Sequence, residues 1–124
     1  MNRQAAQRDS GQSTVELALT LPVLCLFVCG LVQVAVVVRN EVAVQLAARE
    51  AARAAAVSAD PQAAGRLAAE RAVALAPLEV TIHEHDGLVT ASVQYTDHTD
   101  VPFVGLFVPD AVVSATVTMA AEPP

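Results

Sequence analysis

Three histidines near the carboxy-terminal end of the chain are the residues best suited to bind a metal ion. His83 and His85 are two residues apart in a segment of alternating apolar and polar residues, so both side chains are expected on one face of a strand. The candidate cluster also contains the third histidine and four of the seven acids in this third of the chain: His98, Glu84, Asp86, Asp97 and Asp100. No ligand spacing typical of metal sites recurs among them, and a polar hairpin tip explains the same residues. The sequence therefore predicts no metal site and no cofactor, with metal capture by His83 and His85 as the alternative.

Two cysteines, Cys25 and Cys29, are the other residues that could do chemistry. They are one helical turn apart in an uncharged segment, where a disulfide within the helix is geometrically poor. We expect them to act as small apolar residues that line a helix contact together with Gly30, with an intermolecular disulfide as the alternative. The chain also lacks nucleophile signatures, glycine-rich phosphate loops and paired zinc-binding histidines. The prediction is that the protein is not an enzyme.

The elements that carry these residues follow from composition and charge. The chain has 124 residues, enough for one small domain, and 54% of them are apolar while 16% are charged, against about 25% in soluble domains. Seven arginines, no lysine and 13 acids give a net charge of -6, which argues against nucleic-acid binding. Residues 17–38 carry no charge, and residues 77–124 carry seven acids and no arginine. We place a structural boundary near Pro77.

The uncharged segment 17–38 predicts a transmembrane helix. Its 22 residues would form a helix of about 33 Å, and a bilayer core is about 30 Å thick. A cleaved secretory signal has a shorter apolar run, so the segment is expected to stay as a membrane anchor. Pro22 lies in the first two turns of the segment, where a kink in the helix is tolerated. Three arginines follow the segment within 15 residues and two precede it, so charge does not decide the orientation. We expect the amino end in the cytoplasm, because the acidic carboxy-terminal part has no basic residue to retain it.

Two helical segments are expected after the membrane. The alanine-rich residues 41–57 continue the first helix, and Ala48, Ala52 and Ala55 form a stripe of small residues. The helix packs on the chain's own domain, bundles with other subunits, or does both. On the other face we expect Val42, Leu46, Arg49 and Arg53.

The second helix is predicted to begin after Asp60, whose side chain caps it, with Pro61 in first position, and to end at Pro77. An ion pair is expected between Arg66 and Glu70, one turn apart. The expected apolar face contains Leu67, Ala68, Ala72 and Leu75.

A period of two begins at Leu78 and predicts an antiparallel sheet. Asp86-Gly87 stands between two alternating runs, a strong hairpin signal. With these two residues as the turn, Ile82 faces Ala91 and Val80 faces Val93, and the apolar side chains share one face. A third strand is expected over 111–119, and the apolar residues 101–109 form either a flap over the core or an exposed patch.

The predicted fold class is α+β. A long amino-terminal transmembrane helix continues into an extracytoplasmic helix, followed by a short second helix and a small antiparallel sheet of about three strands. The segments are 1–11 (leader), 12–38 (transmembrane helix), 39–76 (extracytoplasmic helices) and 77–124 (sheet).

A family resemblance is carried by residues 9–19, DSGQSTVELAL, at the head of the apolar helix. This motif resembles the amino-terminal signature of type IV pilin-like proteins and, more narrowly, the TadE-like pseudopilins of the tight-adherence machinery that assembles Flp pili. The resemblance extends through the alanine-rich residues 47–56. It implies that a prepilin peptidase cuts after Gly11, which leaves Gln12 as the first residue and Glu16 in fifth position.

For Glu16 the resemblance implies a pairing with the free amino terminus of a neighbouring subunit. An acid at the head of a lipid-embedded helix is costly without such a partner. The alternative is an acid that favours the helix dipole in the headgroup layer and needs no partner.

The implied function is that of a minor pilin or pseudopilin, a structural or assembly subunit of a tight-adherence pilus or a related secretion apparatus. Its expected partners are the prepilin peptidase, other pilins, the inner-membrane assembly proteins and membrane lipid, without nucleic acid. Its expected location is the cytoplasmic membrane, as a single-pass protein, and the cell surface if it enters a pilus. The alternative is a membrane-anchored extracytoplasmic module that binds a metal or a partner protein outside any pilus.

Overall fold

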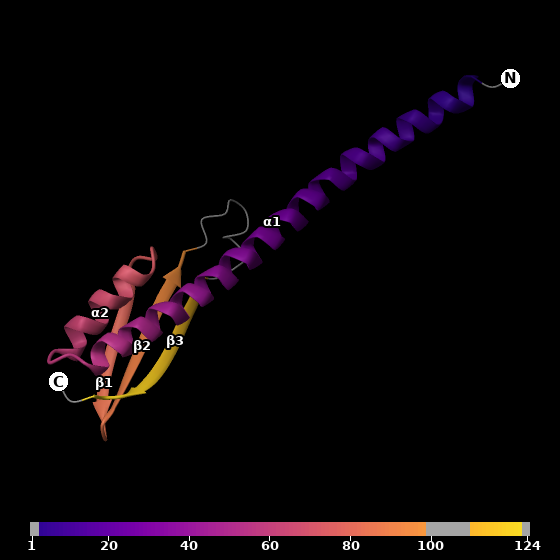
Figure 1. Cartoon of the computed structure of the whole chain (residues 1–124). Helices are drawn as coiled ribbons and strands as arrows, with labels where there is room; N and C mark the ends of the chain where they lie inside the picture. The colour runs from indigo at the N-terminus through magenta and orange to yellow at the C-terminus, as the bar shows by residue number, and fades with distance from the viewer. Residues whose placement is uncertain (1–2, 99–109, 123–124) are drawn as a thin grey trace. The chain divides into compact units, whose positions relative to one another are not determined.

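The computed structural model describes residues 3–98 and 110–122, with side chains from residue 11 onward. Helix α1 (Arg3–Ala56) and helix α2 (Pro61–Ala72) are followed by strands β1 (Leu78–His85), β2 (Leu88–Asp97) and β3 (Ala111–Ala120). This order confirms the predicted α+β class (Figure 1). The chain divides into two compact units, Met1–Val36 and Val37–Pro124. The apolar segment 101–109, predicted as a flap or a patch, lies outside the described residues.

The first unit holds the apolar part of α1. From Gly11 to Ala56 this helix is long and apolar enough to cross a membrane, and Pro22 lies inside it without ending it. The large apolar side chains from Val15 to Val34 are at least half exposed. Exposed apolar surface on this scale is unusual for a water-soluble helix and is what a helix in lipid presents. The prediction of a long apolar amino-terminal helix is therefore confirmed.

The second unit contains the predicted antiparallel sheet in the order β1-β2-β3. Val80 pairs with Val93 and Ile82 with Ala91, the predicted register, and Val93 pairs in turn with Ala115 of β3. The connecting turn consists of Asp86 (φ 51°) and Gly87 (φ 74°). Two consecutive residues with positive φ are typical of the type I′ turn, whose twist matches that of the strands it joins. The turn thus explains why the register can be read from the sequence.

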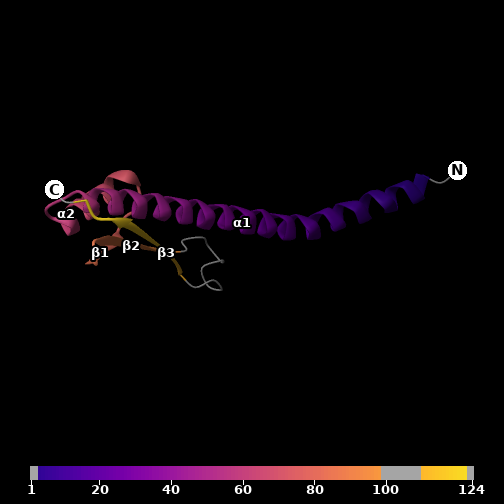
Figure 2. The same ribbon diagram turned by 60° about the horizontal axis from the view of Figure 1, so that its bottom comes forward.

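The core lies between one face of the sheet and the carboxy-terminal part of α1. Within the second unit, Figure 2 shows the three strands on one side of this part of α1. The helix contributes mostly small side chains that are fully or almost fully buried: Val44, Ala47, Ala48, Ala51, Ala52 and Ala55. The sheet contributes Val89, Ala91, Val93 and Val113. The predicted small-residue stripe therefore packs on the chain's own sheet, and bundling of this helix with other subunits stays a prediction.

Helix α2 begins as predicted but ends earlier. The Ala63 amide donates to the Asp60 carboxylate at 3.2 Å, and Pro61 opens the helix. The helix ends at Ala72 instead of continuing to residue 76, because Val73 is extended (φ -138°, ψ 152°). Beyond the helix, Val73 and Leu75 pack against the core.

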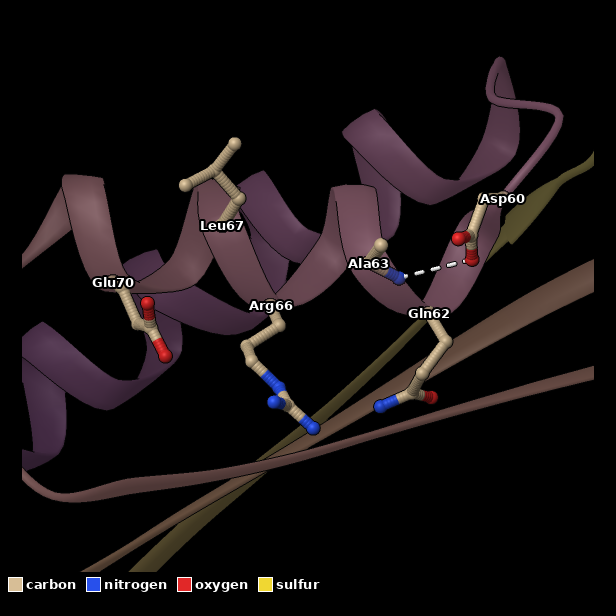
Figure 3. Close-up of a pocket in the computed structure, with 6 residues that line it drawn as sticks. All are labelled: Asp60, Gln62, Ala63, Arg66, Leu67 and Glu70. Carbon is tan, nitrogen blue, oxygen red and sulfur yellow. Dashed lines mark hydrogen bonds between the residues drawn. The ribbon is translucent and has the colours of Figure 1, made fainter.

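The predicted faces of α2 also need correction. Gly65 and Ala69 are its buried residues, whereas Leu67 is 47% exposed. Among the side chains of residues 11–98 and 110–122, ion pairs form only between histidines and acids, so Arg66 and Glu70 are not paired. In Figure 3, Leu67 points away from the sheet, whereas Gln62 and Arg66 extend from the side of the helix that faces the sheet.

Gln62 joins α2 to the edge of the sheet. Its side-chain amide donates to the carbonyl of Val80 at 3.0 Å, and its oxygen accepts from the amide of Ile82 at 3.0 Å. These two bonds are the ones that a neighbouring strand would make to the edge of β1. One glutamine therefore occupies backbone groups that would otherwise be open to another chain.

Replacing Gln62 by alanine is expected to lower the free energy of unfolding by about 1–2 kcal/mol, because two hydrogen bonds are lost in a partly solvated place. Urea unfolding of the full chain in detergent micelles, followed by circular dichroism, measures this change. The control is Arg66→Ala, since Arg66 is exposed on the same helix and makes no ion pair among the described side chains. Equal effects of the two substitutions would contradict the role given to Gln62.

Candidate functional site

The predicted processing site lies in helix α1. Gly11 and Gln12 are both exposed, and a Cβ atom added at Gly11 would meet no atom within 4 Å. Alanine at this position would therefore cause no clash in the helix. A substitution at Gly11 thus reports on recognition of the backbone at this position and leaves the fold unchanged.

Glu16 lies one helical turn after Gln12, so the two side chains share a face of α1. Together with Gly11, Val15 and Leu19 they line a shallow hollow on the helix surface. No basic side chain between residues 11 and 98 or between 110 and 122 lies within ion-pair distance of the Glu16 carboxylate. Because this carboxylate is exposed at the head of an apolar helix, a cation from outside that part of the chain can reach it.

Thr20 satisfies its own hydroxyl group within α1. The hydroxyl donates to the backbone carbonyl of Glu16 at 2.7 Å, four residues earlier. This bond removes the cost of placing an unbonded hydroxyl donor in lipid. The apolar surface that follows contains Cys25 and Cys29 as exposed free thiols.

The histidines are not brought to one place. His83 and His85 are exposed near the hairpin end of β1, where His85 Nε2 lies 3.1 Å from a carboxylate oxygen of Asp86. His98 follows β2 at its other end, and its Nδ1 lies 3.1 Å from a carboxylate oxygen of Asp110. His83 pairs with Thr90, and from Thr90 to Asp97 the strand extends over about 23 Å.

The distance between these ends separates His98 from the other two histidines. Among residues 11–98 and 110–122 no three histidine, cysteine or acidic side chains form a group that could hold a metal ion. Asp100, the remaining member of the predicted cluster, lies outside the described residues.

One polar contact was not predicted from the sequence. Asn40 is 7% exposed, and its side-chain amide donates to a carboxylate oxygen of Asp97 at 2.7 Å. This bond to a charged acceptor ties α1 to the end of β2. The partners are 57 residues apart, and nothing in the local pattern of either segment indicates the other. Asp97 thus has a structural role, because it holds α1 at the end of β2.

Replacing Asn40 by alanine is expected to lower the free energy of unfolding by about 1–3 kcal/mol, because the Asp97 carboxylate loses a donor. Asn40→Asp should cost more than Asn40→Ala, since two carboxylates would then face each other. Chemical unfolding of the original chain and of the two variants, all at full length, gives the order of their free energies of unfolding. If the aspartate variant were as stable as the original chain, the contact would have no energetic weight.

Comparison with known proteins agrees with these features over the helical part of the chain. Residues 11–53 match the family model described as TadE-like protein. The match begins at Gly11 and ends within α1, so it covers the Gly11–Glu16 site and the apolar helix but not α2 or the sheet. No curated protein and no solved structure matches the chain. The amino-terminal segment of this chain, residues 11–53, is thus similar to TadE-like proteins, as the sequence resemblance predicts.

Proposed function

We propose that this protein is a TadE-like minor pilin or pseudopilin, a membrane-anchored subunit that helps to build a tight-adherence pilus or a related secretion apparatus. The observation that carries the proposal is the match over residues 11–53, because it starts at the predicted cleavage site and includes the whole exposed apolar helix. In this role α1 anchors the chain in the cytoplasmic membrane. The amino end lies in the cytoplasm and the sheet lies outside.

Cleavage between Gly11 and Gln12 is the first step of the proposed role. A prepilin peptidase is the expected enzyme, since the TadE-like resemblance implies a cut after Gly11, six residues before the uncharged segment that begins at Leu17. The absence of a side chain at Gly11 lets a protease approach the backbone closely. Cleavage would remove residues 1–11 and create a charged amine at Gln12.

The second step is pairing between Glu16 and the new amine of a neighbouring subunit. The exposed carboxylate has no basic partner among the described side chains, and an amine from another helix would supply one. In a low-dielectric medium such a pair fixes the register of two apolar helices, which otherwise slide. The proposed partners are therefore other pilins, together with the inner-membrane proteins that assemble them.

Intact mass tests the first step. The full chain with a carboxy-terminal tag is expressed with and without a prepilin peptidase, and Gly11→Ala serves as the control because a Cβ atom there meets nothing. The expected result is loss of residues 1–11 only when both the peptidase and Gly11 are present. This result would also place the amino end in the cytoplasm. An unchanged mass would contradict pilin-type processing.

A second candidate is a membrane-anchored module that binds a metal or a protein through His83 and His85. Both side chains are exposed on the same strand face, which is the observation in its favour. The two functions separate by mutation, because Glu16→Ala should disable pilus assembly and leave the sheet intact. The double variant His83→Ala, His85→Ala should affect only the binding module.

A further inference from the structure

The two edges of the sheet are finished in different ways. β2 lies between β1 and β3, so β1 and β3 are the edge strands (Figure 1). On the edge of β1, Gln62 bonds to the carbonyl of Val80 and the amide of Ile82. On the outer edge of β3, no backbone group bonds to any other part of the described chain.

The bonds of Gln62 identify which residues face outward. Because Val80 and Ile82 bond to Gln62, the even-numbered residues of β1 direct their backbone groups away from β2. In the observed register, the odd-numbered residues of β2 then direct their backbone groups toward β3 and bond to odd-numbered residues of β3. The bond from the Ala121 amide to the Gly87 carbonyl, 2.8 Å long, continues this pattern. The residues of β3 with outward backbone groups are therefore Val112, Ser114, Thr116, Thr118 and Ala120.

Within the described residues, the ten residues of β3 have none of the usual protections against strand addition. Natural edge strands are short, charged, bulged, interrupted by proline or covered. β3 has ten residues, AVVSATVTMA, with no charge, no proline and no glycine, and it pairs with β2 without a bulge. Its outward-bonding residues are all exposed. Such an edge is suited to accept a fourth strand, whose main chain would supply the hydrogen bonds.

We propose that the outer edge of β3 binds an extended segment of another protein, which adds to the sheet as a fourth strand and carries lysine or arginine near both ends. The charge of the domain indicates this chemistry. Exposed carboxylates stand at the two ends of β3, Asp110 before it and Glu122 after it. Residues 77–124 contain seven acids and no arginine or lysine. A basic strand is therefore attracted to this edge and an acidic one is repelled.

A second copy of β3 fits this edge less well. Antiparallel pairing of two copies along the strand can be centred on Thr116, where Asp110 of one copy faces Glu122 of the other, or on Ala115, where these two acids are offset by two residues. Like charges directly opposite are destabilising. The proposal does not depend on the membrane anchor, on cleavage at Gly11 or on pilus assembly, so it can fail while the proposed function stands.

The test uses a peptide of the same length as β3, with alternating threonine and valine and a lysine at each end. It is added to the full chain in detergent micelles, and amide exchange is followed by NMR for each residue of β3. The outward amides at 112, 114, 116, 118 and 120 should exchange about tenfold more slowly with the peptide. The inward amides are already bonded to β2 and should not change. The same peptide with glutamate at each end should bind about tenfold more weakly at low salt.

Thr116→Pro is the matched variant. Proline at residue 116 removes one outward amide and leaves the bonds to β2 in place, because its own amide does not face β2. Peptide affinity should fall about tenfold. Thr116→Val keeps the amide and should bind as the original chain does. Faster exchange of the inward amides in the proline variant would mean that proline has disturbed the sheet. In that case the original chain is tested with a peptide that is N-methylated at the central amide that faces β3. The affinity of this methylated peptide should also be about tenfold lower.

Three outcomes would overturn the proposal. Equal binding of the lysine and glutamate peptides would remove the charge argument. Protection of the outward amides without peptide, rising with protein concentration, would assign the edge to a second copy. Protection without peptide at every concentration would assign it to the chain itself.

Discussion

Val93→Asp is expected to unfold the second unit, with a loss of about 4 kcal/mol or more in the free energy of unfolding. Val93 is fully buried in the central strand, between its partners Val80 and Ala115. A carboxylate at this position would lose its hydration, and the apolar side chains and alanines around it offer no hydrogen bond in return. The loss is large against the stability of a small domain, which is about 5–15 kcal/mol.

Hydrogen exchange of the full chain in micelles, measured by mass spectrometry on peptides from β1 and β2, reports this loss. Val112→Asp is the control, because Val112 is 57% exposed on β3 and the chemical change is the same. We expect slow exchange to persist in the control and to disappear in Val93→Asp. Protected strands in both variants would show that the core is not where the structure places it.

Gly65→Leu is expected to lower the free energy of unfolding by about 3 kcal/mol, through a clash instead of a buried charge. A Cβ atom on Gly65 would lie 2.7 Å from Cδ1 and 3.0 Å from Cγ1 of Ile82, and 3.3 Å from the carbonyl oxygen of Ala51. The helix α2 can approach α1 and β1 this closely only because residue 65 has no side chain. A leucine there must push α2 away from both neighbours.

The same site allows a double-mutant test. Gly65→Ala should lower the free energy of unfolding of the original chain. In a chain with Ile82→Ala, which lacks Cδ1 and Cγ1 of Ile82, the same substitution should lower it less or raise it. Ala63→Leu is the control, since Ala63 is exposed on the same helix. Urea unfolding of these variants gives the coupling. Additive effects would mean that Gly65 and Ile82 are not in contact.

Most of the sheet could be predicted because its signals are local. Asp86-Gly87 fixes a two-residue turn, and the alternation on both sides then determines which residues pair, down to Ile82 with Ala91. The third strand and the long apolar helix follow from period and length in the same way. The cap at Asp60 is equally local, because its partner is three residues away.

Contacts between distant segments could not be predicted. The bond between Asn40 and Asp97 and the approach of Gly65 to Ile82 depend on how α1, α2 and β1 pack, and neither has a periodic signal. The end of α2 could not be predicted, because Val73 and Leu75 pack against the core outside the helix although helix propensity permits both to remain in it. The motif at residues 9–19 predicts the Gly11–Glu16 site, and the role of this site stays a prediction.

The burial of Val44 to Ala55 from α1 in the core has a consequence for proteolysis. Membrane proteins often release an intact outer domain when a protease cuts the segment that follows the membrane helix. Here that segment supplies one whole side of the core, from Val44 through Ala51 to Ala55. A cut within it would leave the sheet with an uncovered apolar face. The released fragment would therefore unfold, and an intact soluble form has to begin near Val37, where the second compact unit begins.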